Sequence, residues 1–138
     1  MKILHISDIH YDPYYEPGSV VNCAGKICCR RESNSLNNNE SDGSAGYWGE
    51  LWSSDYKKGV CGTPLQIIEK TLEHISKTQK IDVVFWTGDN ARHMPISSSE
   101  LIFQTTKTIT ELLHIYFKNV AVFPSLGNHD GLPNSHLA

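Results

Sequence analysis

The sequence contains no long apolar run and no surplus of basic residues. No stretch approaches the roughly 20 apolar residues that a membrane-spanning helix needs, so the sequence predicts no transmembrane segment. Twelve Lys and Arg stand against 15 Asp and Glu, which gives a formal net charge of −3. Proteins that bind nucleic-acid backbones usually carry a basic surplus, so the charge indicates no nucleic-acid partner.

A secretory signal is also missing, because the sequence passes directly into the apolar segment 2–7 without a charged and a long hydrophobic region before it. At the other end, the last residues are polar, and no closing helix or strand follows the last motif. We therefore expect residues 1–138 to be a fragment of a longer protein.

The sequence contains four cysteines, and three chemical states are open to them. A zinc site usually needs two close pairs of ligands, and Cys61 lies far from Cys23, Cys28 and Cys29. Two disulfide bonds are therefore favoured over a zinc site or free thiols, which indicates an oxidising compartment. The Asn39-Glu40-Ser41 sequon makes Asn39 a candidate glycosylation site and indicates the same compartment. Four cysteines allow three pairings, so the connectivity stays open.

Apolar periodicity predicts strands and helices in alternation. The elements are strands at 2–7, 81–87 and 120–125 and helices at 63–77 and 97–117. Thr63 is the predicted N-cap of the first helix, with Pro64 at its first position. Strand, helix, strand, helix, strand is the order of a parallel α/β sheet.

A long insert, residues 11–62, separates the first strand from the first helix. It is rich in Pro, Gly, Ser, Asn and Asp and contains all the cysteines, so we expect an irregular segment held by covalent bonds. Arg30 and Arg31 could face a phosphate or lie on the solvated surface. Tyr47 and Trp48 could form an apolar rim for a lipid or a base, or pack locally.

Each predicted strand ends in a polar motif. The motifs are Asp8-Ile9-His10, Gly88-Asp89-Asn90 and Gly127-Asn128-His129-Asp130. The carboxyl ends of parallel strands meet at one edge of the sheet, where α/β proteins bind their ligands. Carboxylate, amide and imidazole groups together suit a pair of divalent metal ions. The alternative is that each motif only caps a turn, but three such motifs at three strand ends favour the metal site.

The three motifs resemble the first three sequence blocks of the calcineurin-like metallophosphoesterases. Four segments narrow the resemblance to the acid sphingomyelinase and acid sphingomyelinase-like phosphodiesterase family. They are Cys23-x₄-Cys28-Cys29-Arg30-Arg31, Gly46-Tyr47-Trp48-Gly49-Glu50, Trp86-Thr87-Gly88-Asp89 through His93, and Phe123-Pro124-Ser125-Leu126-Gly127-Asn128-His129. The resemblance covers essentially the whole chain. It implies the parallel-sheet βαβαβ half of a four-layer α/β/β/α sandwich with a disulfide-linked insert, the N-terminal part of a catalytic domain.

The resemblance also implies two zinc ions. Asp8 and His10 would hold one ion, Asp89 would bridge both, and Asn128 would bind the second. Two metals of this kind activate a water molecule and stabilise the phosphoryl oxygens during in-line attack.

Two further histidines match catalytic positions of the family. His129 and His93 would protonate the leaving group or stabilise the charge of the transition state. The family's disulfide pairing, carried over to this sequence, joins Cys23 to Cys28 and Cys29 to Cys61.

The function implied is metal-dependent hydrolysis of a phosphodiester, such as sphingomyelin at a membrane surface, to ceramide and phosphocholine. The resemblance also implies that the protein is secreted or lies in the lysosomal or vacuolar lumen. The runner-up is a vacuolar endopolyphosphatase, which segment 86–93 resembles, although His129 and the Cys28-Cys29 pair oppose it. A third reading is a non-catalytic lumenal fragment or binding module. The family's later His and Gly-His-x-His ligands are not in residues 1–138, so we expect this piece alone to be inactive.

Overall fold

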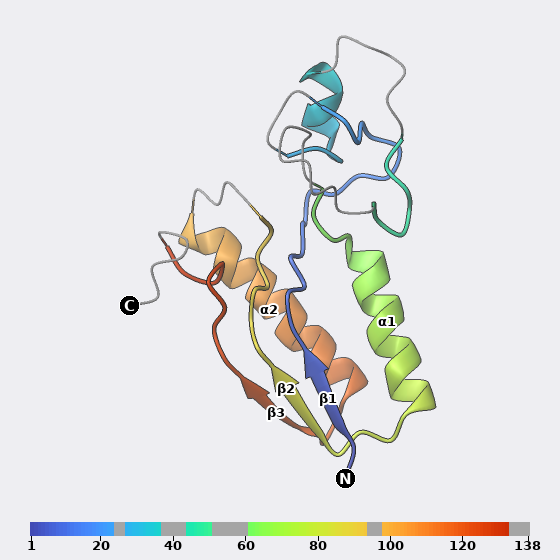
Figure 1. Ribbon diagram of the computed structural model, residues 1–138, viewed down its shortest axis with the longest axis vertical. Helices are drawn as coiled ribbons and strands as arrows, with labels where there is room; N and C mark the ends of the chain where they lie inside the picture. Colours follow the sequence, from blue (N-terminus) through green and yellow to red (C-terminus); the bar gives the residue numbers. More distant parts are fainter. Residues whose placement is uncertain (24–26, 37–43, 51–60, 94–97, 133–138) are drawn as a thin grey trace.

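Three short parallel strands form the sheet in the computed structural model, which describes residues 1–23, 27–36, 44–50, 61–93 and 98–132. The strands are β1 (Ile3–Ile6), β2 (Val83–Trp86) and β3 (Ala121–Pro124), with β2 between the other two (Figure 1). The register pairs Leu4 with Val84 and Val84 with Val122. The predicted parallel α/β sheet is therefore confirmed.

Two amphipathic helices connect the strands, α1 (Leu65–Thr78) and α2 (Ser99–Tyr116). Both pack on the same face of the sheet, because their buried side chains share one hydrophobic core with alternate strand residues. That core includes Leu4, Ile6, Val84, Trp86 and Val122 of the strands, Ile68 and Leu72 of α1, and Ile109, Leu112 and Leu113 of α2. In the part of the chain that is described, no helix has the length and apolar character of a membrane span.

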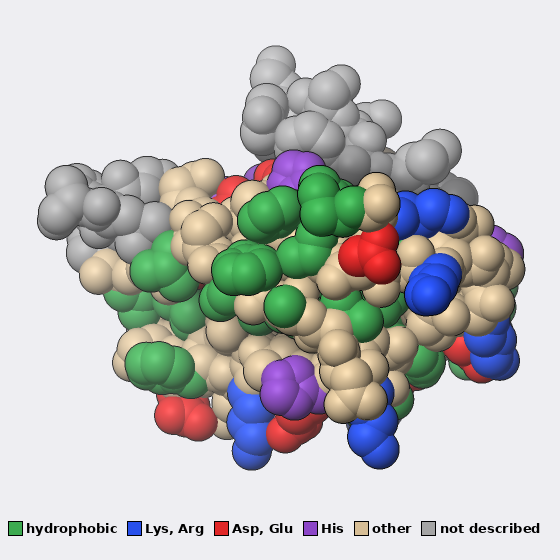
Figure 2. Space-filling view, turned by 90° about the horizontal axis from the view of Figure 1, so that it is seen from below, with side chains coloured by type: hydrophobic (Ala, Val, Ile, Leu, Met, Phe, Trp, Pro, Cys, Tyr) green, Lys and Arg blue, Asp and Glu red, His purple; other side chains and the backbone are tan. Residues whose placement is uncertain are grey.

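The opposite face of the sheet is apolar and exposed. Phe85 and Phe123 are register neighbours on β2 and β3, their ring centroids lie 5.7 Å apart, and their exposed fractions are 42% and 55%. Hydrophobic side chains gather in the upper half of the view from below (Figure 2). A sheet with helices on one face and exposed aromatic rings on the other is consistent with the α/β half of a metallophosphoesterase sandwich.

The predicted N-cap of the first helix is wrong. Pro64, not Thr63, occupies the cap position, and no side chain caps the helix. Thr63 is engaged elsewhere, because its backbone N–H donates to the His10 carbonyl (2.9 Å) and its carbonyl accepts from the Asp12 N–H (2.9 Å). This pairing keeps Thr63 in an extended bridge with Tyr11.

Among its described residues, the insert contains a short helix that the composition did not predict, the 3₁₀ helix η1 (Arg31–Leu36). Two disulfide bonds close the insert, Cys23–Cys28 and Cys29–Cys61, with the pairing that the resemblance implied. Neither sequence-based reading of Arg30 holds, because its guanidinium is buried and pairs with the carboxylate of Asp12 (Nε to Oδ2, 2.7 Å). Such a buried charge needs a partner, and Asp12 supplies it.

Candidate metal centre

The loop after β1 turns sharply to present Asp8 and His10. Both residues adopt left-handed backbone angles, with φ of 55° and 46°. Their N–H groups donate to the carbonyls of Gly88 (3.1 Å) and Asp89 (3.0 Å), so the loop after β1 is bonded to the loop after β2. Asp89 also has a positive φ of 55°. Strained backbone at three polar residues is typical of a functional site, because neighbouring bonds must stabilise it.

Two glycines allow the loops after β2 and β3 to touch. Gly88 has a φ of +82°, and a Cβ on it would lie 2.1 Å from the backbone nitrogen of Gly127. A Cβ on Gly127 would lie 2.2 Å from Oδ1 of Asp89. Only glycine fits at either position, which explains why the second motif begins with Gly88 and the third with Gly127.

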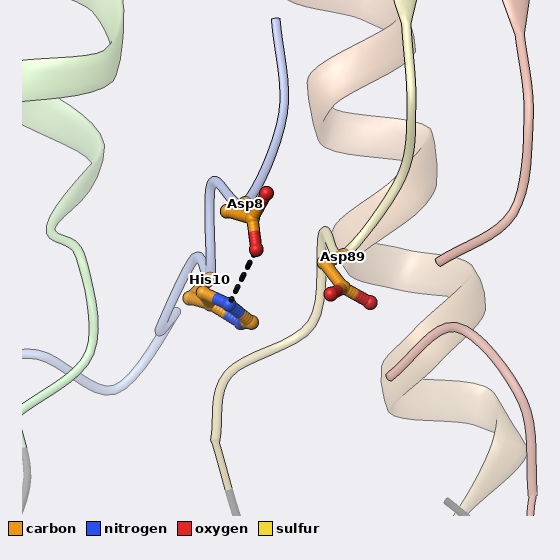
Figure 3. Close-up of side chains that lie close together, drawn as sticks. All are labelled: Asp8, His10 and Asp89. Carbon is orange, nitrogen blue, oxygen red and sulfur yellow. Dashed lines mark ion pairs between the residues drawn. The ribbon is translucent and has the colours of Figure 1, made fainter. Parts of the chain in front are cut away.

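Asp8, His10 and Asp89 converge at the edge of the sheet (Figure 3). Each offers one ligand atom, and these atoms all lie within 4.8 Å of one another. Nε2 of His10 is 3.7 Å from Oδ1 of Asp8, while Nδ1 is 2.9 Å from the carbonyl of Ala91. Because a carbonyl only accepts hydrogen bonds, Nδ1 donates in this contact, and Nε2 is the ring nitrogen that faces Asp8. This is the arrangement of a metal-ligating histidine.

Two further imidazole rings, those of His93 and His129, lie beside His10 of this cluster. The centroid of His10 lies 3.7 Å from that of His93 and 5.1 Å from that of His129. Burial, reinforced by His10 and His129, lowers the pKa of His93 to about 4, so its ring is neutral at pH 7. Nδ1 of His129 is buried and has no hydrogen-bond partner within the described residues. A buried ring nitrogen of this kind needs a partner, and the ring lies 5.1 Å, between centroids, from that of His10 in the cluster.

One cavity of about 590 Å³ joins these groups. All the predicted metal-ligating and catalytic residues line it, namely Asp8, His10, Asp89, His93, Asn128 and His129. The backbone N–H of His129 also donates to Oδ1 of Asp89 (2.8 Å). Two carboxylates, an amide oxygen and imidazoles in one cavity fit divalent metal ions, since such ions prefer oxygen and nitrogen donors.

Comparison with known proteins identifies the family. Residues 1–137 match the profile described as Calcineurin-like phosphoesterase. The chain belongs to that family. It is 36% identical over 137 residues to sphingomyelin phosphodiesterase B of Dictyostelium discoideum, covering 96% of this chain and 20% of the relative. Against the sphingomyelin phosphodiesterase of Bos taurus the identity is 35% over 133 residues, with 96% and 20% coverage.

A relative with another name is also similar. The endopolyphosphatase of Debaryomyces hansenii is 31% identical over 153 residues, covering 97% of this chain and 19% of the relative. The chain thus spans about a fifth of the length of the curated relatives it matches. Membership of the calcineurin-like phosphoesterase family implies divalent metal ions at the cavity described above.

Asp130 is the residue that the sequence reasoning missed. Its carboxylate accepts the N–H groups of Asp89 (2.7 Å), Asn90 (2.8 Å) and Gly127 (2.8 Å). It therefore fixes the loop after β2 against the loop after β3, beside the candidate ligand Asp89. The sequence did offer one signal for Asp130. It is the last residue of the third motif, and a carboxylate three residues after Gly127 can accept the N–H of that glycine.

The remaining candidate residues belong to the insert. Asn39 lies outside the described residues. Arg31 is on the surface, with 86% of its side chain exposed and an ion pair to Glu16 (3.3 Å). Tyr47 and Trp48 are half exposed, and their rings contact each other edge to face at 4.9 Å. Trp48 also lines the metal cavity.

Proposed function

We propose that this chain is the N-terminal part of the catalytic domain of a metal-dependent phosphodiester hydrolase that cleaves sphingomyelin to ceramide and phosphocholine. The observation that carries the proposal is the convergence of Asp8, His10 and Asp89, with ligand atoms within 4.8 Å of one another. Similarity to sphingomyelin phosphodiesterases supports the substrate. In this proposal, residues 11–62 form an insert of that domain, and a C-terminal half completes it.

Two zinc ions are the cofactors in this proposal. Asp8 and His10 would hold one ion, Asp89 would bind both, and Asn128 would bind the second. When bound, the ions supply Lewis-acid stabilisation of the phosphoryl oxygens and make water a better nucleophile at neutral pH. The remaining ligands belong to the C-terminal half of the domain, so residues 1–138 alone are inactive.

His129 is the proton donor to the leaving group in this proposal. As the phosphorus–oxygen bond breaks, the imidazolium gives its proton to the departing alcohol oxygen of ceramide. Its position is supported by the bond from its backbone N–H to Asp89 (2.8 Å). His93 has a different role, because its pKa of about 4 leaves the ring neutral at pH 7. A neutral ring can still donate a hydrogen bond to the phosphoryl oxygen as charge develops.

The compartment follows from the covalent bonds of the insert. Both disulfides require oxidising surroundings. We therefore propose that the protein is secreted or resides in the lysosomal or vacuolar lumen, with a glycan on Asn39. Substrate is met at a membrane surface, since sphingomyelin is a membrane lipid.

The test of this function is hydrolysis by the full-length protein before and after chelation. We expect turnover of sphingomyelin and of bis-p-nitrophenyl phosphate to be lost with the metal and restored by zinc. Equal rates with and without chelator would exclude metal-dependent catalysis.

His129→Ala separates a proton donor from a metal ligand. We expect zinc content near that of the wild type and a 10²- to 10⁴-fold loss of sphingomyelin turnover, the range of a lost general acid. The loss should be smaller on bis-p-nitrophenyl phosphate, because its acidic leaving group needs little protonation. Equal losses on both substrates together with zinc depletion would place His129 among the metal ligands.

Endopolyphosphatase activity is the second candidate, favoured by the similarity to the Debaryomyces hansenii protein. The same preparation tests it with polyphosphate in place of sphingomyelin. Cleavage of polyphosphate alone would make it the better function. A zinc-loaded protein that cleaves neither substrate would favour a non-catalytic binding module.

A further inference from the structure

The metal cavity has a second wall that is not part of the sheet edge. Trp48, Gly49 and Glu50 line the same cavity of about 590 Å³ as Asp8 and Asp89. These three residues belong to the insert, and neither the metal ions nor the proton donor of the proposed function requires them. Their chemistry is therefore available for recognising another part of a bound molecule.

The turn formed by residues 46–50 is held in place by several contacts. The N–H of Gly49 donates to the carbonyl of Gly46 (3.3 Å), and the N–H of Gly46 donates to Oε1 of Glu50 (2.5 Å). The hydroxyl of Tyr15 also donates to the Gly46 carbonyl (2.8 Å). Gly49 has a φ of +106°, and a Cβ on it would lie 3.2 Å from Cδ of Pro64. The turn is thus seated on the residue that precedes α1, which fixes Trp48 and Glu50 relative to the sheet edge.

Trp48 keeps part of its indole available to a ligand. Its exposed fraction is 51%, and its ring contacts the ring of Tyr47 edge to face, with the centroids 4.9 Å apart. Such a contact leaves indole surface uncovered, and an indole face attracts cations through its ring quadrupole.

The cavity is also acidic. Among the described residues that line it, Asp8, Glu50 and Asp89 carry carboxylates and none is Lys or Arg. Asp8 and Asp89 belong to the metal cluster, which leaves Glu50 for another cation. Burial raises the pKa of Tyr15 to about 12, and the negative charge of Glu50 nearby adds to this increase.

We infer that Trp48 and Glu50 form a subsite for the quaternary ammonium group of a choline phosphodiester, whose phosphate lies at the metal cluster. An aromatic face beside a carboxylate is the combination that recognises quaternary ammonium ions. The inference rests on the proposed function, since it assigns the choline end of the substrate to a wall of the same cavity.

The test compares two soluble substrates of the full-length protein that share p-nitrophenol as the leaving group. p-Nitrophenyl phosphorylcholine carries the quaternary ammonium, and bis-p-nitrophenyl phosphate does not. We expect Trp48→Ala to lower the ratio of kcat/KM between them about 3- to 30-fold, the range of one cation–π contact. Glu50→Gln should lower the ratio as well, since glutamine can still accept the Gly46 N–H but has no charge.

Two controls define the result. Trp48→Phe keeps an aromatic face and should retain most of the preference for the choline substrate. Phe103→Ala removes a 70% exposed ring of α2 and should leave the ratio unchanged. An unchanged ratio in both Trp48→Ala and Glu50→Gln would overturn the subsite, as would a loss confined to sphingomyelin in vesicles, which would indicate membrane contact instead.

Binding without turnover separates this inference from the proposed function. Zinc-loaded wild-type protein, titrated with phosphocholine and with inorganic phosphate, should bind phosphocholine more tightly, and Trp48→Ala should remove that difference. Equal affinities in the wild type would overturn the subsite even if the protein hydrolyses phosphodiesters. A preference for phosphocholine in a protein without hydrolytic activity would support the subsite and contradict the proposed function.

Discussion

The sheet-edge loops and the cysteine-rich insert are stabilised by different interactions. At the sheet edge, backbone N–H groups bond to neighbouring loops, and the carboxylate of Asp130 accepts three of them. In the insert, two disulfides and the buried pair of Asp12 and Arg30 add to backbone bonds such as that from the Ala45 N–H to the Ser19 carbonyl (2.7 Å). A site that positions ligand atoms needs directional bonds beside it, whereas a long polar segment with little core needs covalent closure.

The comparison predicts that substitutions in the two regions affect different properties of the protein. Changes in the insert should lower the free energy of unfolding, while changes at the sheet edge should lower metal affinity. The following variants are ordered from the largest expected effect to the smallest.

Asp12→Ala should be the most damaging change. Its partner Arg30 is only 7% exposed and would remain as a buried charge without its carboxylate. Breaking a buried pair in this way costs about 3–5 kcal/mol of folding free energy. Chemical denaturation of the full-length protein measures it. The matched control is Arg31→Ala, which removes an exposed pair with Glu16 and should cost about 0–1 kcal/mol. Similar losses in both variants would contradict the structural role of Asp12.

Removal of the disulfides should follow, with the longer loop having the larger effect. Cys29–Cys61 spans 32 residues and Cys23–Cys28 spans 5. In the chain-entropy description, closing these loops stabilises the folded state by about 4 and about 2 kcal/mol, respectively. Denaturation of the two Cys→Ala double variants compares them. Reactive thiols in denatured wild-type protein from the secretory pathway would contradict both bonds.

Asp130→Ala should have the smallest effect on folding and a specific effect on the metal. Without its carboxylate, the loop bearing Asp89 is no longer fixed, and zinc affinity should fall about 10- to 100-fold, as for other residues that orient ligands. Zinc titration of the full-length protein measures this. Asp82→Ala is the control, because Asp82 accepts an N–H from Lys2 (2.6 Å) at the opposite end of the strand. Equal zinc affinity in Asp130→Ala and wild type would show that Asp130 does not position the centre.

Local patterns in the sequence were enough to predict the sheet and the convergence of the motifs. Strands such as Val83–Trp86 show β-branched and aromatic runs, and the parallel arrangement brings their carboxyl ends to one edge. The contacts of Asp130 with Asp89 and Asn90 were not predictable in this way. They join residues 40 and 41 positions apart, and their partners are backbone groups whose orientation no pattern reveals.

The errors have the same physical origin. Thr63 has the composition of an N-cap, but its backbone is already bonded to His10 and Asp12. Arg30 looked like a surface or phosphate-binding residue, but Asp12, 18 positions away, draws it into the interior. Tertiary contacts therefore override local preference where the insert meets the sheet edge.

Zinc analysis of wild-type and Asp89→Asn full-length protein tests most directly whether the loops after β1, β2 and β3 form one metal centre. We expect two zinc ions in the wild type, and we expect Asp89→Asn to lose zinc together with phosphodiester hydrolysis, because the bridging position loses its charge. An Asp89→Asn variant that keeps both ions and the wild-type rate would contradict a shared centre at this edge of the sheet.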